Sequence, residues 1–154
     1  MINNYNFEEL KHLVITNLNE KNISYIIEDK KDVAVFWFDK NNAFFCSVDV
    51  LRATVNHLDG SAPFNLNEGK EYDLMTINDM VDHIIKIMTN DMFQIETYKM
   101  GKLCSTNQYI IVNGEREFCS SYCIKHGYFF LPLVRKKIKT ICYKYKTGER
   151  YKVD

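Results

Sequence analysis

The sequence predicts an α+β fold in which a largely antiparallel β-sheet, built from hairpins and meanders, is covered by two amphipathic helices. Three observations lead to this expectation. Two stretches place apolar residues at helical spacing, several others alternate with the two-residue period of strands, and short polar turns separate the strands. Because tight turns join antiparallel neighbours, most strands should pair with strands adjacent in the chain.

The first helix is expected to follow Asn6. The Asn6 side chain can cap a helix, and Glu8 and Glu9 place carboxylates in the first turn, where the helix dipole favours them. The apolar residues that repeat at helical spacing are Phe7, Leu10, Leu13, Val14 and Leu18. A helix with one such stripe buries it against another element, and strands follow at once.

Strands are predicted at residues 23–28, 33–39 and 43–49. Aromatic and β-branched residues are frequent in these stretches, and short polar segments separate them. The first six positions of the middle stretch are all apolar, on both alternating faces. We therefore expect an interior strand that is covered on both sides.

The next two stretches are read as a short helix and a loop. Residues 49–58 have helical apolar spacing, and Asp49 is available as a cap. Residues 59–73 contain Pro63 and Gly69 and are expected to form an irregular connection. Long loops inside compact domains are often where binding occurs.

The second helix is predicted to begin at Thr76, whose hydroxyl can act as a cap, with the carboxylate of Asp79 three residues on. Its apolar stripe comprises Ile77, Met80, Val81, Ile84, Ile85 and Met88. Tight turns then favour strands at 93–100, 103–112 and 118–122.

The clearest alternation in the chain is at residues 136–146, and this stretch is rich in lysine. Lysine on a terminal strand is typical of a sheet edge protected against aggregation. Each half of the chain has a predicted helix followed by predicted strands, which suggests a possible helix-plus-meander duplication. We expect a single domain, 1–154, made of units 6–58 and 74–146 joined by the loop 59–73.

Composition indicates a cytoplasmic protein. The sequence has no run of about 18 uncharged apolar residues, which a spanning helix would need. Its first residues lack a basic segment followed by an apolar one, so no secretory signal is expected. Five cysteines in this context predict free thiols. The excess of Lys over Arg, and the many Asn and Ile, are typical of an AT-rich bacterial gene.

No pattern in the sequence predicts catalysis. The six glycines are isolated, so no glycine-rich phosphate loop is present, and no known catalytic motif occurs. Cys46, His57 and Asp59 supply a thiol, a base and a carboxylate, but Cys46 falls within a predicted strand, where nothing activates it. We expect no enzyme activity and no cofactor.

Two groups of residues have side chains that could bind a metal ion. The first has soft ligands for zinc: Cys119, Cys123 and His126, with Cys104 and Cys142 elsewhere. Two cysteines four residues apart lie about 13 Å apart along a strand, too far for one zinc ion. The second group is Asp79, Asp82 and His83, which fits the solvated face of a helix better than a hard-metal site. We expect no bound metal.

Charge is distributed unevenly along the chain. Residues 1–124 carry eleven basic and eighteen acidic side chains, whereas residues 125–154 carry nine and two. Between Asp59 and Glu96 there are eight acidic residues and two lysines. Such asymmetry favours an electrostatic partner. The residues that we expect to contact a protein partner are Glu68, Glu71, Tyr72, Asp73, Asp79 and Asp82.

In size, composition and fold class the chain is similar to small cytosolic immunity proteins, which neutralise a co-inherited bacterial toxin by covering its active site. That likeness implies a non-catalytic inhibitor whose partner is a toxin domain. Many such toxins are nucleases with basic clefts, which an acidic surface would face. The alternative is a nucleic-acid-binding or regulatory module that uses the basic carboxy-terminal strand, where tyrosines and lysines interleave. The acidic remainder of the chain disfavours nucleic acid, because it repels phosphate.

Overall fold

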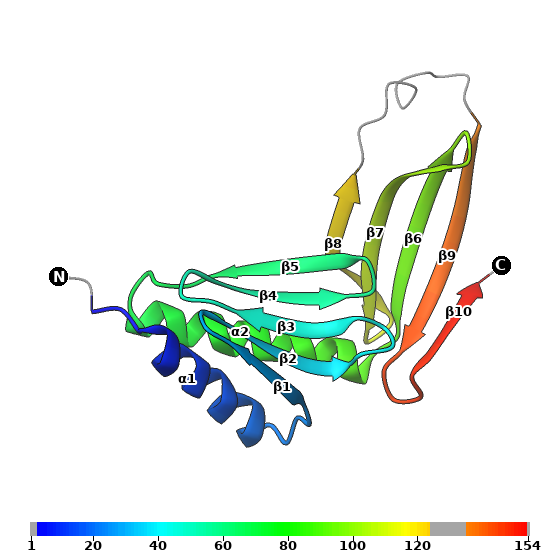
Figure 1. The fold of residues 1–154 in the computed structure, drawn as a ribbon. Coiled ribbons are helices and arrows are strands. Elements are labelled where there is room, and N and C mark those ends of the chain that lie inside the picture. Colours follow the sequence, from blue (N-terminus) through cyan, green and yellow to red (C-terminus); the bar gives the residue numbers. More distant parts are fainter. Residues whose placement is uncertain (1–2, 124–134, 154) are drawn as a thin grey trace. The chain divides into compact units, whose positions relative to one another are not determined.

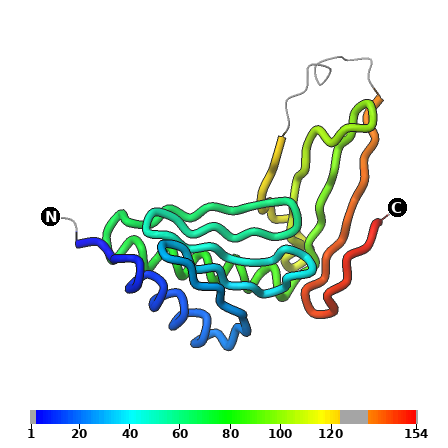
Figure 2. The backbone as a smooth tube through the Cα atoms, in the orientation of Figure 1, coloured from blue at the N-terminus to red at the C-terminus, as the bar shows by residue number. Residues whose placement is uncertain are grey.

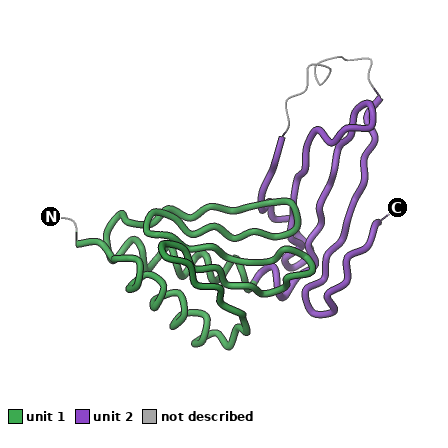
Figure 3. The backbone as a smooth tube through the Cα atoms, in the orientation of Figure 1, with its two compact units in different colours: residues 1–85 green, residues 86–154 purple. Residues whose placement is uncertain are grey.

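The computed structural model describes residues 3–123 and 135–153. It confirms the α+β class: two helices and ten strands are described, and the strands form two five-stranded antiparallel sheets (Figure 1). The described chain divides into two compact units, residues 1–85 and 86–154 (Figure 3). The single-domain organisation stays a prediction.

The first unit is a meander covered by helices. Its strands are β1 (Ile26–Lys30), β2 (Val33–Asp39), β3 (Phe44–Val48), β4 (Arg52–His57) and β5 (Gly60–Asn65), and each pairs with the next in the chain (Figure 2). The helices α1 (Phe7–Glu20) and α2 (Lys70–Thr89) lie on one face of this sheet (Figure 1).

The start of α1 follows the predicted capping pattern. The Asn6 side chain accepts a hydrogen bond from the Glu9 backbone N–H at 2.9 Å, and the Glu9 carboxylate accepts one from the Asn6 N–H at 2.9 Å. This reciprocal pair satisfies two N–H groups that the first turn leaves free. Leu10, Val14 and Leu18 are fully buried, as the stripe predicts.

The core of the first unit is apolar. The helix-facing side chains of the central strands are fully buried: Ala34, Phe36, Phe44, Cys46, Val48, Ala53 and Val55. They meet the inner face of α2, where Ile77, Met80, Val81 and Ile84 are buried. The Cys46 Sγ lies 3.3 Å from the Met80 Sδ, which places β3 directly against the helix. Ile87 replaces Ile85 in the predicted stripe, since Ile85 is half-buried.

The interior position predicted for residues 33–39 is confirmed. β2 pairs with β1 on one side and β3 on the other. Ala34, Val35 and Phe36 point alternately to opposite faces of the sheet, and all three are buried. On the face away from the helices burial is limited to Val35, since Val33 and Trp37 are only half-buried.

The short helix predicted at 49–58 is wrong, because Asp49 caps a turn. Its Oδ1 accepts hydrogen bonds from the backbone N–H groups of Leu51 at 2.7 Å and Arg52 at 2.9 Å. This side chain-to-backbone bonding is a known alternative to a helix N-cap. The chain turns there and enters β4.

The loop predicted at 59–73 is also largely wrong. Residues 60–65 form β5, an edge strand, where Pro63 is tolerated because a missing N–H costs nothing on the open side. Helix α2 begins at Lys70 instead of Thr76. The buried Asp73 explains this earlier start, since its Oδ1 accepts a hydrogen bond from the Glu68 N–H at 3.1 Å.

The second unit contains the last turn of α2 and a sheet with the order β10-β9-β6-β7-β8. Its strands are β6 (Met92–Lys99), β7 (Lys102–Val112), β8 (Glu115–Cys123), β9 (Lys136–Lys144) and β10 (Glu149–Val153). A helix followed by five strands thus occurs twice, but this second sheet is not a simple meander, because β9 pairs with β6.

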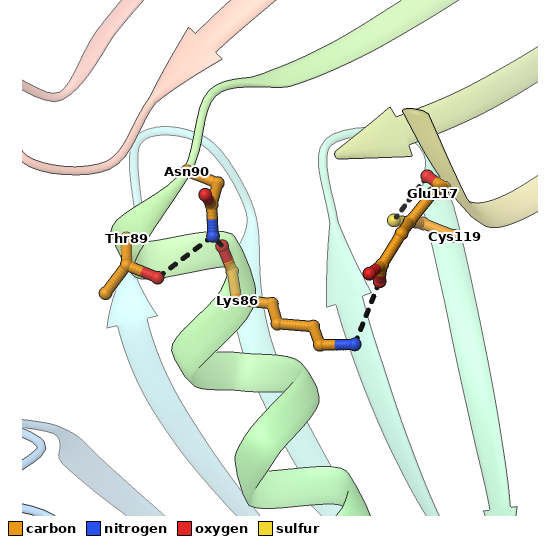
Figure 4. Close-up of polar contacts among 5 residues, drawn as sticks. All are labelled: Lys86, Thr89, Asn90, Glu117 and Cys119. Atoms are coloured by element: carbon orange, nitrogen blue, oxygen red, sulfur yellow. Dashed lines mark hydrogen bonds and ion pairs between the residues drawn. The ribbon is translucent and has the colours of Figure 1, made fainter. Parts of the chain in front are cut away.

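The end of α2 is bonded to β8 within the second unit (Figure 4). The Lys86 ammonium contacts a Glu117 carboxylate oxygen at 2.8 Å. The Asn90 side chain donates to the Lys86 carbonyl at 3.0 Å and to the Thr89 hydroxyl at 3.1 Å. The Lys86 carbonyl therefore accepts two hydrogen bonds, since the Asn90 backbone N–H also donates to it at 3.1 Å.

A chain of polar side chains crosses β8, β7 and β6 on the buried face of the second sheet. Ser120 donates to Gln108 at 2.7 Å, Gln108 donates to Gln94 at 2.8 Å, and Gln94 donates to Glu96 at 2.9 Å. The Tyr98 hydroxyl donates to the other Glu96 oxygen at 2.7 Å. We call these five residues the polar ladder.

Candidate interaction surfaces

The outer side of α2 carries most of the predicted partner residues. Glu71, Tyr72, Asp79 and Asp82 are exposed at helical spacings that place them opposite the buried stripe, and Glu68 is exposed just before the helix. Met75 is also exposed, one turn from both Glu71 and Tyr72. We call these six residues the acidic face.

Asp73 does not belong to the acidic face, although it was predicted to contact a partner. Its side chain is fully buried, and its Oδ1 holds the backbone of Glu68. The residue orders the start of α2 and is not available to a partner. The prediction failed because the helix was expected to begin at Thr76, so the buried stripe was not extended back to position 73, four residues before Ile77.

The carboxylates of the acidic face have no counter-ion. Among the residues that the structure describes, none of Glu68, Glu71, Asp79 and Asp82 forms an ion pair. Carboxylates elsewhere in the first unit do: Glu9 lies 3.6 Å from Lys70 and Glu28 lies 3.1 Å from Lys40. The acidic face thus groups four carboxylates for which the described residues supply no ion-pair partner.

Two large apolar side chains lie among these carboxylates. Tyr72 is 64% exposed and Met75 is 58% exposed. Sequence analysis identified Tyr72 but missed Met75, since the helix was expected to begin after it. Aromatic and methionine side chains are enriched at protein-binding surfaces, whose rims are polar.

A groove of about 360 Å³ adjoins the acidic face in the first unit. It is lined from α1 by Asn17, Glu20 and Lys21, and from α2 by Asn78, Val81 and Asp82. Its lining is mainly polar. It extends the surface that a partner can contact from one helix to two.

The second charged surface is basic and belongs to the second unit. It consists of Arg135, Lys136, Lys137, Lys139 and Lys152, none of which forms an ion pair with a described residue. We call these five residues the basic edge. Two grooves meet here, of about 390 Å³ and 230 Å³, and both are lined by Lys137 and Lys139.

The edge prediction for the lysine-rich strand is wrong, because β10 lies outside β9 in the sheet. β10 covers residues 140–144 of β9, so that β9 is interior there. Val153, the last described residue of β10, pairs with Thr140. Residues 136–139 therefore have a strand partner only on the β6 side among the described residues.

The thiol, imidazole and carboxylate considered for catalysis do not form a reactive set. Burial raises the pKa of the Cys46 thiol to about 12, so the nucleophilic thiolate is not available. Burial, reinforced by the nearby His83, lowers the pKa of His57 to about 3. The His57 and His83 ring centroids lie 5.9 Å apart, whereas Asp59 is exposed.

The metal candidates are also dispersed. No group of three His, Cys, Asp or Glu side chains suited to one ion occurs in residues 3–123 and 135–153. All five cysteines are free thiols, and His126 lies outside the described residues. Burial raises the pKa of Cys119 to about 12, assisted by the Glu117 carboxylate. His83 lies 5.9 Å from the ring of Phe64 on β5, while Asp79 and Asp82 are exposed.

No described helix has the length and apolar character needed to cross a membrane. No protein-family model matches the chain, and neither a curated protein nor a solved structure shows significant similarity to it.

Proposed function

We propose that this protein is a non-catalytic binding protein of the cytoplasm whose acidic face covers a basic cleft on a protein partner. The observation that carries the proposal is the grouping of four exposed carboxylates without counter-ions around Tyr72 and Met75 on one helix face. Carboxylates arranged in this way attract a cationic cleft over a distance, and the two apolar side chains supply contact area.

Within this class, the proposed role is that of a small immunity protein that neutralises a bacterial toxin. A nuclease toxin binds phosphate in a basic cleft, and a row of carboxylates presents a similar pattern of negative charge. The helix supports this role physically, since its inner face is buried against the first sheet and its outer side chains need no rearrangement. A preformed surface loses little entropy on binding.

The experiment requires the product of the neighbouring gene as the candidate partner, captured by co-expression or from the native host. The double reversal Glu71→Lys with Asp79→Lys should slow association about tenfold or more at low salt, because it replaces attraction by repulsion. The matched control is Asp32→Lys with Glu115→Lys, which changes the charge equally at two exposed sites outside the acidic face.

The apolar side chains give a second measurement. Tyr72→Ala and Met75→Ala should speed dissociation, since truncating a central anchor costs more than ~1 kcal/mol of binding energy. Leu51→Ala is the control, because Leu51 is 62% exposed but lies outside the acidic face. Equal kinetics for the acidic-face variants and their controls would contradict the proposed surface.

A further inference from the structure

The second sheet has two faces of different character. From Met92 to Thr97 on β6, and from Cys104 to Ile111 on β7, buried and half-buried residues alternate. The buried residues include Gln94, Glu96 and Gln108 of the polar ladder. Because successive side chains of a strand point to opposite sides of a sheet, the half-buried residues belong to the other face.

This other face carries a row of side chains that crosses all five strands. Strand pairing places one residue of each strand side by side, in the order Tyr151, Cys142, Phe93, Tyr109 and Phe118. Two further rows add Val153, Ile95 and Ile138, and their other described positions hold only Thr, Asn, Ser and Cys. We call these three rows the aromatic face.

Much of the aromatic face is accessible. Phe118 is 61% exposed, Ile138 63%, Tyr151 42% and Val153 40%. None of the described residues in the three rows is charged. A contiguous apolar patch of this kind marks an interaction surface.

A charged row borders the aromatic face at one end. Its members in strand order are Glu149, Lys144, Asp91, Ile111 and Arg116. Lys144 lies 3.6 Å from Asp91, whereas Arg116 and Glu149, on the two outer strands, form no ion pair with a described residue. The Arg116 guanidinium carbon lies 5.2 Å from the centroid of the Tyr109 ring, which places it beside the aromatic face. An apolar centre with a charged rim is the usual anatomy of a protein interface.

We propose that the aromatic face binds the same face of a second copy of this chain, with β8 of each copy opposite β10 of the other. A two-fold axis along the central strand β6 produces this arrangement, so every contact occurs twice. Phe118 then lies over Tyr151 of the second copy, and Arg116 lies opposite Glu149 of the second copy. Charge complementarity selects this axis, because an axis across the strands would place the charged row over uncharged residues.

The aromatic face is large enough for such a dimer. Five strands about 4.8 Å apart and three rows about 7 Å apart cover about 500 Å² on each copy, or about 1,000 Å² in total. That total is near the lower limit for a specific interface, so we expect the dimer to dissociate in the micromolar range. Two sheets that pack face to face in this way interdigitate their inner side chains.

Sedimentation velocity of the full chain, at concentrations from about 1 to about 100 µM, measures this association. Phe118→Glu should weaken it about tenfold or more, because the change places a charge in the desolvated centre of the interface. The matched control is Tyr122→Glu, since Tyr122 is 55% exposed on the same strand but pairs with Thr106 on the opposite face. Ile138→Glu is a second disrupting variant, and circular dichroism checks that each variant is folded. Equal association of the folded disrupting variants and the control would overturn the proposal.

A charge exchange tests the arrangement of the two copies. Arg116→Glu and Glu149→Arg should each weaken the dimer about two- to fivefold, as expected for an exposed ion pair. The two changes together should restore it, because the exchanged charges again face each other across the axis. The control Arg150→Glu, on the opposite face of β10, should leave association unchanged. A double variant that associates no better than the single ones would overturn the arrangement of β8 over β10.

The remaining outcomes concern other occupants of the aromatic face. A chain that stays monomeric throughout this concentration range would overturn the proposal. A monomer that binds an oligothymidylate, or the neighbouring gene product, and loses this binding in Phe118→Glu would assign the face to that ligand instead. The Glu71/Asp79 double reversal should leave the dimer unchanged, so this inference and the proposed function can fail separately.

Discussion

Both sheets bury apolar side chains, but the second sheet also buries a set of hydrogen-bonded polar ones. In the first unit the covered face is apolar from Ala34 to Val55, and helix α2 packs Met80 and Ile84 against it. In the second unit the buried face includes Gln94, Glu96, Thr106, Gln108 and Ser120. Apolar burial is non-directional and tolerates small shifts, whereas hydrogen bonds require fixed geometry. The first unit should therefore depend on volume and the second on specific partners.

The largest expected effect tests the apolar side of this comparison. Ile84→Ala should destabilise the protein by ~2–5 kcal/mol, because it empties a fully buried aliphatic site. Asn78→Ala, on the outer side of the same helix, should change stability by less than about 0.5 kcal/mol. Urea unfolding followed by circular dichroism measures both. Similar losses from the two variants would contradict the orientation of α2.

The second prediction tests the polar side. Gln108→Leu keeps the volume but removes both ladder bonds, to Ser120 and to Gln94. Each buried group left without a partner costs about 1–3 kcal/mol. The neighbouring change Asn107→Leu, on the opposite face of β7, should cost much less. If Gln108→Leu proves neutral or stabilising by chemical denaturation, the ladder does not hold the second sheet together.

The third prediction concerns pH and belongs to the first unit. The pKa of His57 is about 3 in the folded protein, below its ordinary value of 6.5, so the unfolded chain binds more protons between these values. The contribution of neutral His57 to the free energy of unfolding is therefore fully present above about pH 6.5 and is lost as pH falls toward 3. Between pH 7 and pH 5 the loss should be about 2 kcal/mol.

Unfolding in urea at the two pH values measures this loss. His57→Gln should remove most of the difference between pH 7 and pH 5, whatever its effect on absolute stability. The control is His12→Gln, since His12 is exposed on α1. An unchanged pH dependence in His57→Gln would assign the effect to other groups.

The smallest effect is expected at the end of α2. Lys86→Ala removes the 2.8 Å contact to Glu117, but both side chains are partly exposed. Exposed ion pairs of this kind contribute about 0.2–1 kcal/mol. A double-mutant cycle with Glu117→Ala isolates the pair, and its coupling energy should fall as salt is raised. A coupling energy larger than the loss of stability in Ile84→Ala would contradict the expected order, in which core burial matters more than this ion pair.

Local patterns predicted the regular elements well. The α1 stripe, the interior strand at 33–39 and the hairpins after α2 follow from periods that each stretch carries within itself. The errors occurred where one side chain could stabilise either of two local backbone conformations. Asp49 could cap a helix or a turn, and only the pairing of β4 with β3 and β5 decides between them.

The candidate surfaces were predicted only in part. An earlier helix start shifted Asp73 into the core and brought Met75 to the surface, which composition alone does not reveal. The pairing of β9 with β6 joins residues more than 35 positions apart, and no local signal encodes it.

The two unpaired charge clusters also affect how the protein behaves in solution. The formal net charge is zero and the pI is about 6.9, so little long-range repulsion separates molecules near neutral pH. Opposite uncompensated patches on each molecule then attract those of another. Such contacts between unlike patches either close into a ring or continue from molecule to molecule, depending on the rotation between neighbours. Salt screens this attraction. The protein should therefore be more soluble, and bind less non-specifically in capture experiments, at moderate than at low ionic strength.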